Sequence, residues 1–156
     1  MSQPHPKPHS RDLRKGRFSE AERLYHIRAS THGRRPLFHD LLLGREVVGA
    51  LRFQHEQGRL QSLAFVVMPD HFHWLIRLTG AVSLDAVMHA VKGFSAHRIN
   101  KHLRRNGPVW QAGYFDRALR ADDDVRSIAR YIVANPLRAG LCSRPGDYAL
   151  WDAIWV

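Results

Sequence analysis

Two histidines separated by one residue, His71 and His73, have the types and spacing of a metal-binding pair. They follow a Pro69-Asp70 break and alternate with apolar residues, as expected of a β-strand. Because side chains alternate along a strand, both imidazoles would project from the same face, about 7 Å apart at the backbone. The pair could share one metal ion, or it could be two ordinary hydrogen-bonded histidines in a chain that contains eleven.

A tyrosine and an asparagine four residues apart, Tyr131 and Asn135, form a second candidate group. Apolar residues around them recur with a helical period, and the two side chains stack together beside this apolar stripe. A phenol and an amide oxygen could then both address a site beside a sheet. Tyr131 could instead be a half-buried packing residue, and Asn135 could cap a short helix that begins at Pro136.

The elements that must position these groups alternate between strands and helices. Strands are expected at 24–31, 63–68, 71–78 and 109–119, and helices at 38–57, at 83 to about 105, and from the Asp122-Asp123-Asp124 run to the Asn135-Pro136 break. This order is the split βαβ arrangement. The sequence therefore predicts an α+β, ferredoxin-like (βαββαβ) antiparallel sheet with helices on one face and an added C-terminal helix that carries Tyr131.

The composition limits the classes of binding partner and the cellular compartment that fit this chain. The 24 Lys and Arg residues against 14 Asp and Glu residues give a net charge of +10, which favours a polyanionic partner such as nucleic acid, although ribosomal and lipid-binding proteins share this property. The single cysteine, Cys142, excludes an internal disulfide and a cysteine-based zinc site. We expect a basic mobile arm at 1–17, one domain at 18–156, a cytoplasmic, nucleoid-associated location and no membrane partner.

Three segments together resemble a known family. Met68-Pro69-Asp70-His71-Phe72-His73-Trp74 is similar to the His-hydrophobic-His signature of the HUH single-strand transposases, and Arg130-Tyr131-Ile132-Val133-Ala134-Asn135-Pro136 resembles their tyrosine-bearing helix. Val109-Trp110-Gln111 lies between them, as in the REP-associated tyrosine transposase branch. The resemblance runs from about Leu13 to Trp155 and depends on the ordered combination of motifs.

The resemblance implies a site and a reaction. His71 and His73 would bind Mg²⁺ or Mn²⁺, which would act as a Lewis acid and template. Asn135 would be the third ligand, where relatives often carry Gln or His. Tyr131 would be the single nucleophile and would form a 5′-phosphotyrosine intermediate in DNA nicking and strand transfer. Tyr114 is a rival nucleophile, but it falls in a predicted strand.

Single-stranded or hairpin DNA with palindromic, REP-like sequence is the implied substrate, bound by a monomer or a homodimer. The candidate DNA contacts are Arg34, Arg35, Lys92, Arg104, Arg105 and Arg120, although any of them could be an ordinary solvated charge. Two other functions remain open. A ferredoxin-like module could bind single-stranded nucleic acid without catalysis, and a metal hydrolase could use water on the histidine pair.

Overall fold

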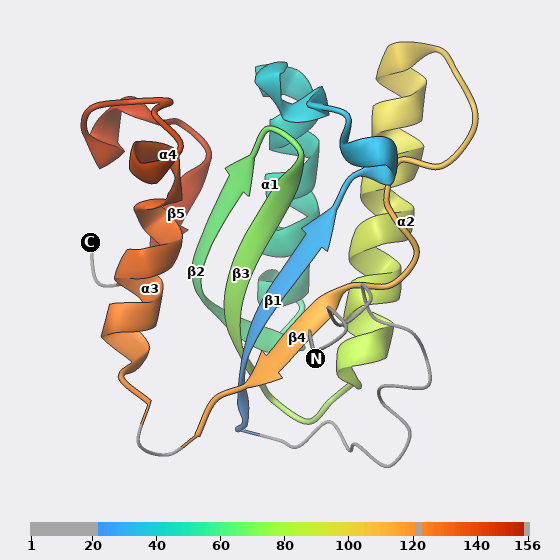
Figure 1. Cartoon of the computed structure of the whole chain (residues 1–156). Helices are drawn as coiled ribbons and strands as arrows, with labels where there is room; N and C mark the ends of the chain where they lie inside the picture. Colours follow the sequence, from blue (N-terminus) through green and yellow to red (C-terminus); the bar gives the residue numbers. More distant parts are fainter. Residues whose placement is uncertain (1–21, 121–122, 155–156) are drawn as a thin grey trace, which may run out of the picture.

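A five-stranded antiparallel sheet organises the chain (Figure 1). The computed structural model describes residues 22–120 and 123–154, so the arm expected at 1–17 lies outside the described residues. The strands are β1 (Leu24–Ser30), β2 (Leu60–Met68), β3 (His71–Leu78), β4 (Phe115–Ala118) and β5 (Trp151–Ala153). Their order across the sheet is β4-β1-β3-β2-β5. The first four strands have the ferredoxin-like arrangement, which confirms the predicted α+β fold class.

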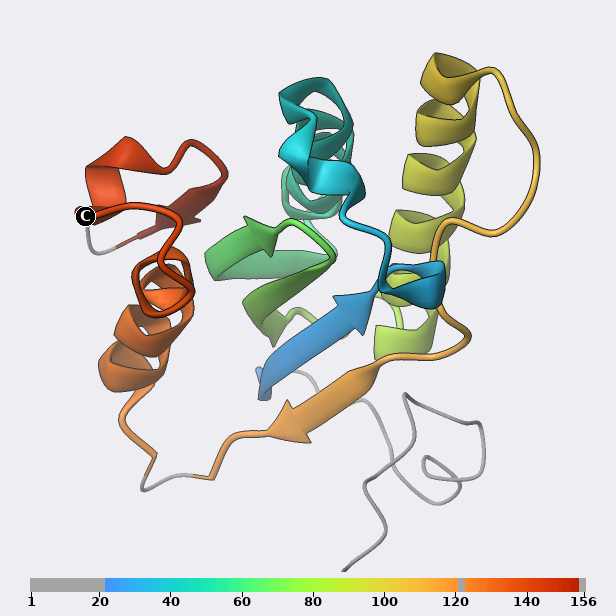
Figure 2. The same ribbon diagram turned by 45° about the horizontal axis from the view of Figure 1, so that its top comes forward.

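The helices cover the two faces of this sheet unequally. They are α1 (Leu41–Glu56), α2 (Leu84–Leu103), α3 (Val125–Val133) and α4 (Asn135–Arg138), with short 3-10 helices at His32–Arg34, Leu37–His39 and Pro145–Asp147. Helices α1 and α2 lie side by side on one face, whereas α3 and α4 lie on the other (Figures 1 and 2). The predicted pair of helices on one face and the added tyrosine-bearing helix are therefore both present.

The main core lies between the sheet and helices α1 and α2. Alternation along the central strands directs Ile27, Phe72 and Trp74 to this side, where each is fully buried. The indole Nε1 of Trp74 donates a hydrogen bond to Ser62 Oγ (2.9 Å), so its one polar atom is satisfied inside the core. This core fixes strands β1 and β3, and the opposite residues of the same strands face the other side.

A smaller apolar cluster attaches α3 to that other side. Ala129 and Ile132 of α3 are buried against Val66 and Met68 of β2 and Leu75 of β3. The contacts of α3 with the sheet are mainly with β2. Helix α3 therefore covers the β2 side of this face, and its other flank faces β1 and β4.

Several predicted boundaries were wrong. The strand predicted at 109–119 is reduced to β4. Trp110 forms one isolated β-bridge with Thr31 and packs into the core, and Gly113 then turns the chain at positive φ (72°). Helix α1 begins three residues after its predicted start because Asp40 caps it, its side chain accepting from the backbone N–H of Leu42.

The predicted strand 63–68 begins earlier, at Leu60, and carries a bulge between Ser62 and Ala64. Strand β5, on the outer edge of β2, was not predicted. It has only three residues, which is too short for a recognisable alternation.

Across residues 22–120 and 123–154, no helix combines the length and the apolar character needed to span a membrane.

Candidate active site

The two histidines lie at the start of β3, directly after the Pro69-Asp70 turn. Both side chains project from the sheet face that carries α3, opposite the main core. Their ring centroids are 5.1 Å apart and the rings meet edge to face at 81°. The strand geometry therefore brings His71 and His73 together as the sequence predicted.

A carboxylate orients His71. The Nδ1 atom of His71 lies 2.7 Å from Asp70 Oδ1, and Asp70 Oδ2 accepts from Arg34 Nε at 3.0 Å. Burial lowers the pKa of His71 even though Asp70 opposes this shift. Burial alone would raise the pKa of Asp70, but its hydrogen bonds to His71 and Arg34 lower it. At neutral pH the site thus holds a neutral imidazole bonded to an ionised carboxylate.

A third histidine, His26 of β1, contacts His73. Its Nε2 atom lies 3.0 Å from His73 Nδ1, and His73 is only 8% exposed. Burial, followed by the charges of neighbouring groups, lowers the pKa of His73 to about 2. Burial and the nearby Arg117 and Arg28 lower the pKa of His26 to about 4. Both imidazoles are therefore neutral at physiological pH, which is the form that binds metal ions.

The donor set fits a divalent cation held through Nε2 atoms. Both Nδ1 atoms are occupied by hydrogen bonds, to Asp70 and to His26, so Nε2 is the nitrogen that each ring can offer. Within the described ranges, no group of three or more His, Cys, Asp or Glu side chains could hold a metal ion.

Asn135 opens α4, and its amide Nδ2 donates to the backbone oxygen of Ile132 (3.1 Å). The side chain does not cap α4, so the interpretation of Asn135 as an N-cap was wrong. Because the amide nitrogen makes this bond, the amide oxygen is the group left for a ligand. Asn135 does not line the cavity beside His73, and its role as the third ligand stays a prediction.

Tyr131 is an exposed aromatic residue on α3, with 55% of its surface accessible. The neighbouring Ile132 anchors the helix in the smaller apolar cluster. Arg138 of α4 places its guanidinium carbon 3.9 Å from the centre of the Tyr131 ring and donates from Nη2 to the Tyr131 backbone oxygen (2.6 Å). Tyr131 therefore lies outside both apolar clusters, with its ring at the surface against a cation.

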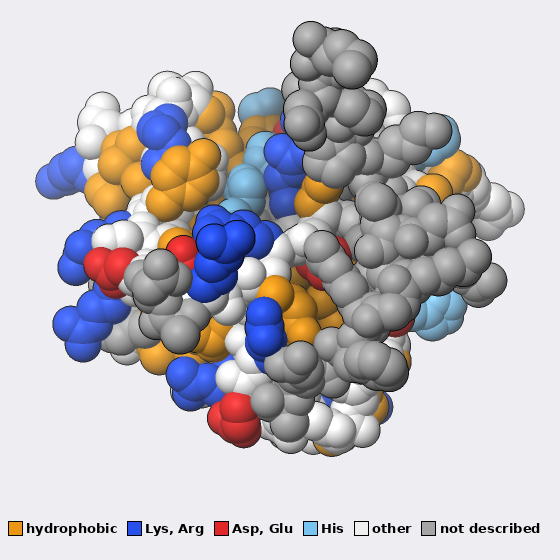
Figure 3. Space-filling model, turned by 60° about the horizontal axis from the view of Figure 1, so that its bottom comes forward, with side chains coloured by type: hydrophobic (Ala, Val, Ile, Leu, Met, Phe, Trp, Pro, Cys, Tyr) orange, Lys and Arg blue, Asp and Glu red, His pale blue; other side chains and the backbone are white. Residues whose placement is uncertain are grey.

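An open cavity of about 600 Å³ joins Tyr131 to His73 and His26, whereas His71 does not line it. It is lined by His26, Arg28, His73, Phe115, Asp116, Arg117 and Tyr131. Arg28 is the cross-strand neighbour of His73, and its guanidinium carbon lies 4.6 Å from the centre of the Phe115 ring. On this side of the molecule, Figure 3 shows histidine side chains at the bottom of a hollow beside Lys and Arg side chains. The cavity therefore combines a phenol, two imidazoles, two cations, a carboxylate and an aromatic ring.

The other three tyrosines of the chain are not available as nucleophiles. Tyr25 is buried in the main core. Tyr114 precedes β4, contrary to its predicted place in a strand, and its buried hydroxyl donates to Asp85 Oδ1 (2.8 Å). The Tyr148 hydroxyl donates to the backbone oxygen of Val67, and burial raises the pKa of Tyr148 to about 12. Tyr131 remains as the exposed tyrosine.

The predicted DNA contacts are dispersed. Arg34 reaches the histidine site through Asp70, and Arg35 bonds the backbone oxygens of His32 and Pro108. The ammonium of Lys92 lies on α2 and donates to two backbone oxygens, those of Gln111 and Gly113 (both 2.6 Å), so it shapes a loop.

The remaining three predicted contacts also lie outside the cavity beside His73. Arg104 and Arg105 line a hollow at the C-terminal end of α2, and Arg120 is exposed just after β4. Of the six predicted contacts, the structure brings only Arg34 to the histidines.

The sequence interpretation missed His26, Arg28, Phe115, Arg117 and Arg138. The alternation signal was present on β1, where Tyr25 and Ile27 point to the core and His26 and Arg28 to the opposite face. Combining this alternation with the β1–β3 pairing that a ferredoxin-like sheet has would have placed His26 and Arg28 beside the histidine pair. Arg138 follows the predicted end of the last helix, so no periodic pattern included it.

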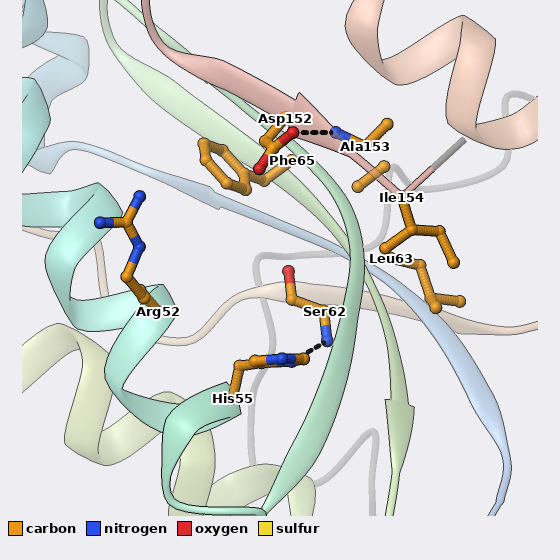
Figure 4. Close-up of a pocket in the computed structure, with 9 residues that line it drawn as sticks. Arg52, His55, Ser62, Leu63, Phe65, Asp152, Ala153 and Ile154 are labelled. Atoms are coloured by element: carbon orange, nitrogen blue, oxygen red, sulfur yellow. Dashed lines mark hydrogen bonds between the residues drawn. The ribbon is translucent and has the colours of Figure 1, made fainter. Parts of the chain in front are cut away.

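A second cavity, of about 190 Å³, lies between α1, β2 and β5 (Figure 4). His55 is turned toward β2 there, where its Nδ1 accepts from the backbone N–H of Ser62 (3.0 Å). Arg52 also projects from α1, and Asp152 lies across the cavity on β5. No tyrosine lines this cavity, so it is a separate feature from the site described above.

The chain matches a known protein family. The family model described as "Transposase IS200 like" matches residues 20–135. A comparison with curated proteins finds no match.

Two solved structures are similar to the chain. The first is a REP-associated tyrosine transposase bound to a REP hairpin, with a TM-score of 0.73, 19% identity, and coverage of 86% of this chain and 79% of that one. The second is a putative transposase from Deinococcus radiodurans R1, with a TM-score of 0.54, 25% identity, and coverage of 74% and 92%. Because the family model spans well over half of the sequence, the chain belongs to the IS200-like transposase family.

Proposed function

We propose that this transposase cuts and rejoins single-stranded DNA through a covalent bond to Tyr131, as an HUH-type enzyme of the REP-associated branch. One observation carries the proposal. The exposed Tyr131 of α3 and the buried His73 of β3 line the same cavity, although they come from distant parts of the sequence. In phosphodiester cleavage, a tyrosine hydroxyl can act as the nucleophile while paired imidazoles bind the metal ion that the reaction uses.

The reaction is an exchange of phosphodiester bonds. The phenolic oxygen of Tyr131 attacks a DNA phosphorus, an oxygen–phosphorus bond forms, and the bond from phosphorus to the 3′ oxygen breaks. The phenolic proton leaves to solvent, and the departing 3′ oxygen takes up a proton. The products are a 5′-phosphotyrosine and a free 3′-hydroxyl. A second 3′-hydroxyl can displace Tyr131 by the reverse step, which joins two strands without an external energy source.

The proposed site residues have different roles in this reaction. His71 and His73 would hold Mg²⁺ or Mn²⁺ through their Nε2 atoms, with the amide oxygen of Asn135 as the proposed third protein ligand. A cation held there would supply Lewis-acid stabilisation of negative charge on the phosphate oxygens. Arg28, the cross-strand neighbour of His73, binds a non-bridging phosphate oxygen and orients the phosphodiester toward Tyr131.

The proposed substrate is single-stranded DNA next to a hairpin. Its support is the net charge of +10, the Phe115 ring for base stacking, and the similar transposase whose structure contains a REP hairpin. Arg34 extends the cationic surface from the cavity to the Asp70 turn. Arg35, Arg104, Arg105 and Arg120 remain proposed contacts for DNA farther from the cut.

The test uses hairpin oligonucleotides from the flanks of the gene, labelled at either end and incubated with the protein and Mn²⁺ or Mg²⁺. Denaturing gels should show a protein-linked 5′ end and a free 3′-hydroxyl, both absent with EDTA and in Tyr131→Phe. DNA binding without an adduct would favour a non-catalytic module. Cleavage to a free 5′ phosphate that persists in Tyr131→Phe would favour a hydrolase that uses water.

A further inference from the structure

His26 lines the cavity and makes a direct hydrogen bond to one member of the histidine pair, His73. It lies on β1, where its cross-strand neighbours are Leu75 of β3 and Arg117 of β4. From there its ring reaches diagonally to His73, with Nε2 to Nδ1 at 3.0 Å and ring centroids 5.2 Å apart. The tilt between the rings is 37°, so the contact is a hydrogen bond between ring edges rather than stacking.

This bond constrains which nitrogen of His73 carries the proton. A neutral imidazole has one N–H and one bare nitrogen, and a metal ion binds the bare one. If Nε2 of His73 faces the cation, Nδ1 must carry the proton and donate it in a hydrogen bond. The acceptor is then the bare Nε2 of His26, and the proton of His26 lies on its Nδ1.

We propose that His26 is a positioning residue that fixes His73 in the Nδ1–H form and aims its Nε2 atom at the metal. This inference rests on the proposed function, because it assigns the metal to the Nε2 atoms of the histidine pair. His26 would act on His73 as Asp70 acts on His71, since each supplies an acceptor at Nδ1.

The backbone supports this role. His26 and His73 belong to adjacent strands, and the residues that flank them in sequence, such as Ile27 and Phe72, are fully buried in the main core. The backbone of neither residue can move far without disturbing that packing. The sheet therefore holds the two side chains within reach of each other, and the hydrogen bond between the rings sets their orientation.

Three variants separate a hydrogen-bonding role from simple filling of space. His26→Phe keeps a ring of similar size and removes the acceptor. His26→Gln places an amide oxygen near the position of Nε2, so it can still accept from His73. His89→Gln removes an exposed histidine of α2 and is the control for nonspecific metal binding.

Two readouts apply to each variant. Long-range ¹H–¹⁵N spectra of the metal-free protein report the tautomer of His73, and titration with Mn²⁺ followed by electron paramagnetic resonance reports the Kd. We expect Nδ1–H in the wild type and in His26→Gln. In His26→Phe we expect loss of this tautomer and a Kd raised about 10- to 100-fold. The Kd of His26→Gln should stay within about threefold of the wild type, since its acceptor is retained.

An unchanged His73 tautomer and an unchanged Kd in His26→Phe would overturn the inference. Equal losses in His26→Phe and His26→Gln would also overturn it, because the acceptor would then be irrelevant. Failure of the proposed function gives a different result. If His73→Ala binds Mn²⁺ as the wild type does, the metal assignment fails, while the tautomer spectra still decide the role of His26.

Discussion

Truncating Ile132 tests whether α3 is held on the sheet by its own small cluster. The Ile132 side chain is fully buried between α3 and strands β2 and β3. Ile132→Ala removes three buried carbons, which at about 0.8 kcal/mol each gives about 2.4 kcal/mol before any cavity penalty. The measured range for such truncations is about 2–5 kcal/mol. At about 1.4 kcal/mol per factor of ten, about 2.4 kcal/mol corresponds to an equilibrium constant for opening of the helix that is about 50-fold larger.

Amide hydrogen exchange is the assay, and Ile99→Ala is the matched control. Ile99 is equally buried, but it lies on α2 in the main core. Both variants should lose a similar free energy of unfolding in urea titrations. Only Ile132→Ala should speed exchange in α3, because opening of α3 alone does not break the contacts of Ile99. DNA adduct formation should likewise fall in Ile132→Ala and persist in Ile99→Ala.

Equal acceleration of α3 exchange in both variants would refute this reasoning, because α3 and the main core would then open as one unit. Wild-type adduct formation in Ile132→Ala would show that docking of α3 does not position Tyr131.

Three further predictions concern single side chains. Tyr114→Phe should form the DNA adduct normally but lose about 1–3 kcal/mol of stability in urea, because Asp85 loses this donor; loss of the adduct would contradict the assignment of Tyr131. Asp70→Asn should weaken Mn²⁺ binding about tenfold in titrations, because His71 loses a charged acceptor; an unchanged Kd would exclude this role. Arg28→Gln should reduce the salt dependence of single-stranded DNA binding by about 0.7 in log–log slope, as expected for one lost phosphate contact in fluorescence anisotropy; an unchanged slope would remove Arg28 from the interface.

Local patterns were sufficient to predict much of the fold. The alternation on β3 placed His71 and His73 on one face, because side chains two residues apart in a strand point to the same side. The helical period around Ile132 likewise separated its buried side from Tyr131. Both results depend only on neighbours within one element.

Features that depend on contacts between elements were not predicted. His26 becomes part of the site through the pairing of β1 with β3, and Arg138 through its stacking on Tyr131 from the next helix. Lys92 has the sequence context of an exposed cation, yet its ammonium is used by backbone oxygens of a distant loop. Such roles are set by tertiary structure, which charge and periodicity alone do not encode.

Peptide mapping of the covalent adduct tests the central claim most directly. Trypsin cuts after Arg130 and Arg138, so Tyr131 falls in its own peptide, 131–138, apart from those that contain Tyr25, Tyr114 and Tyr148. After reaction with hairpin DNA and Mn²⁺, nuclease trimming and mass spectrometry should find a nucleotide phosphate on peptide 131–138 alone. An adduct on another tyrosine peptide, or cleaved DNA with none of these peptides modified, would contradict the assignment of Tyr131 as the nucleophile.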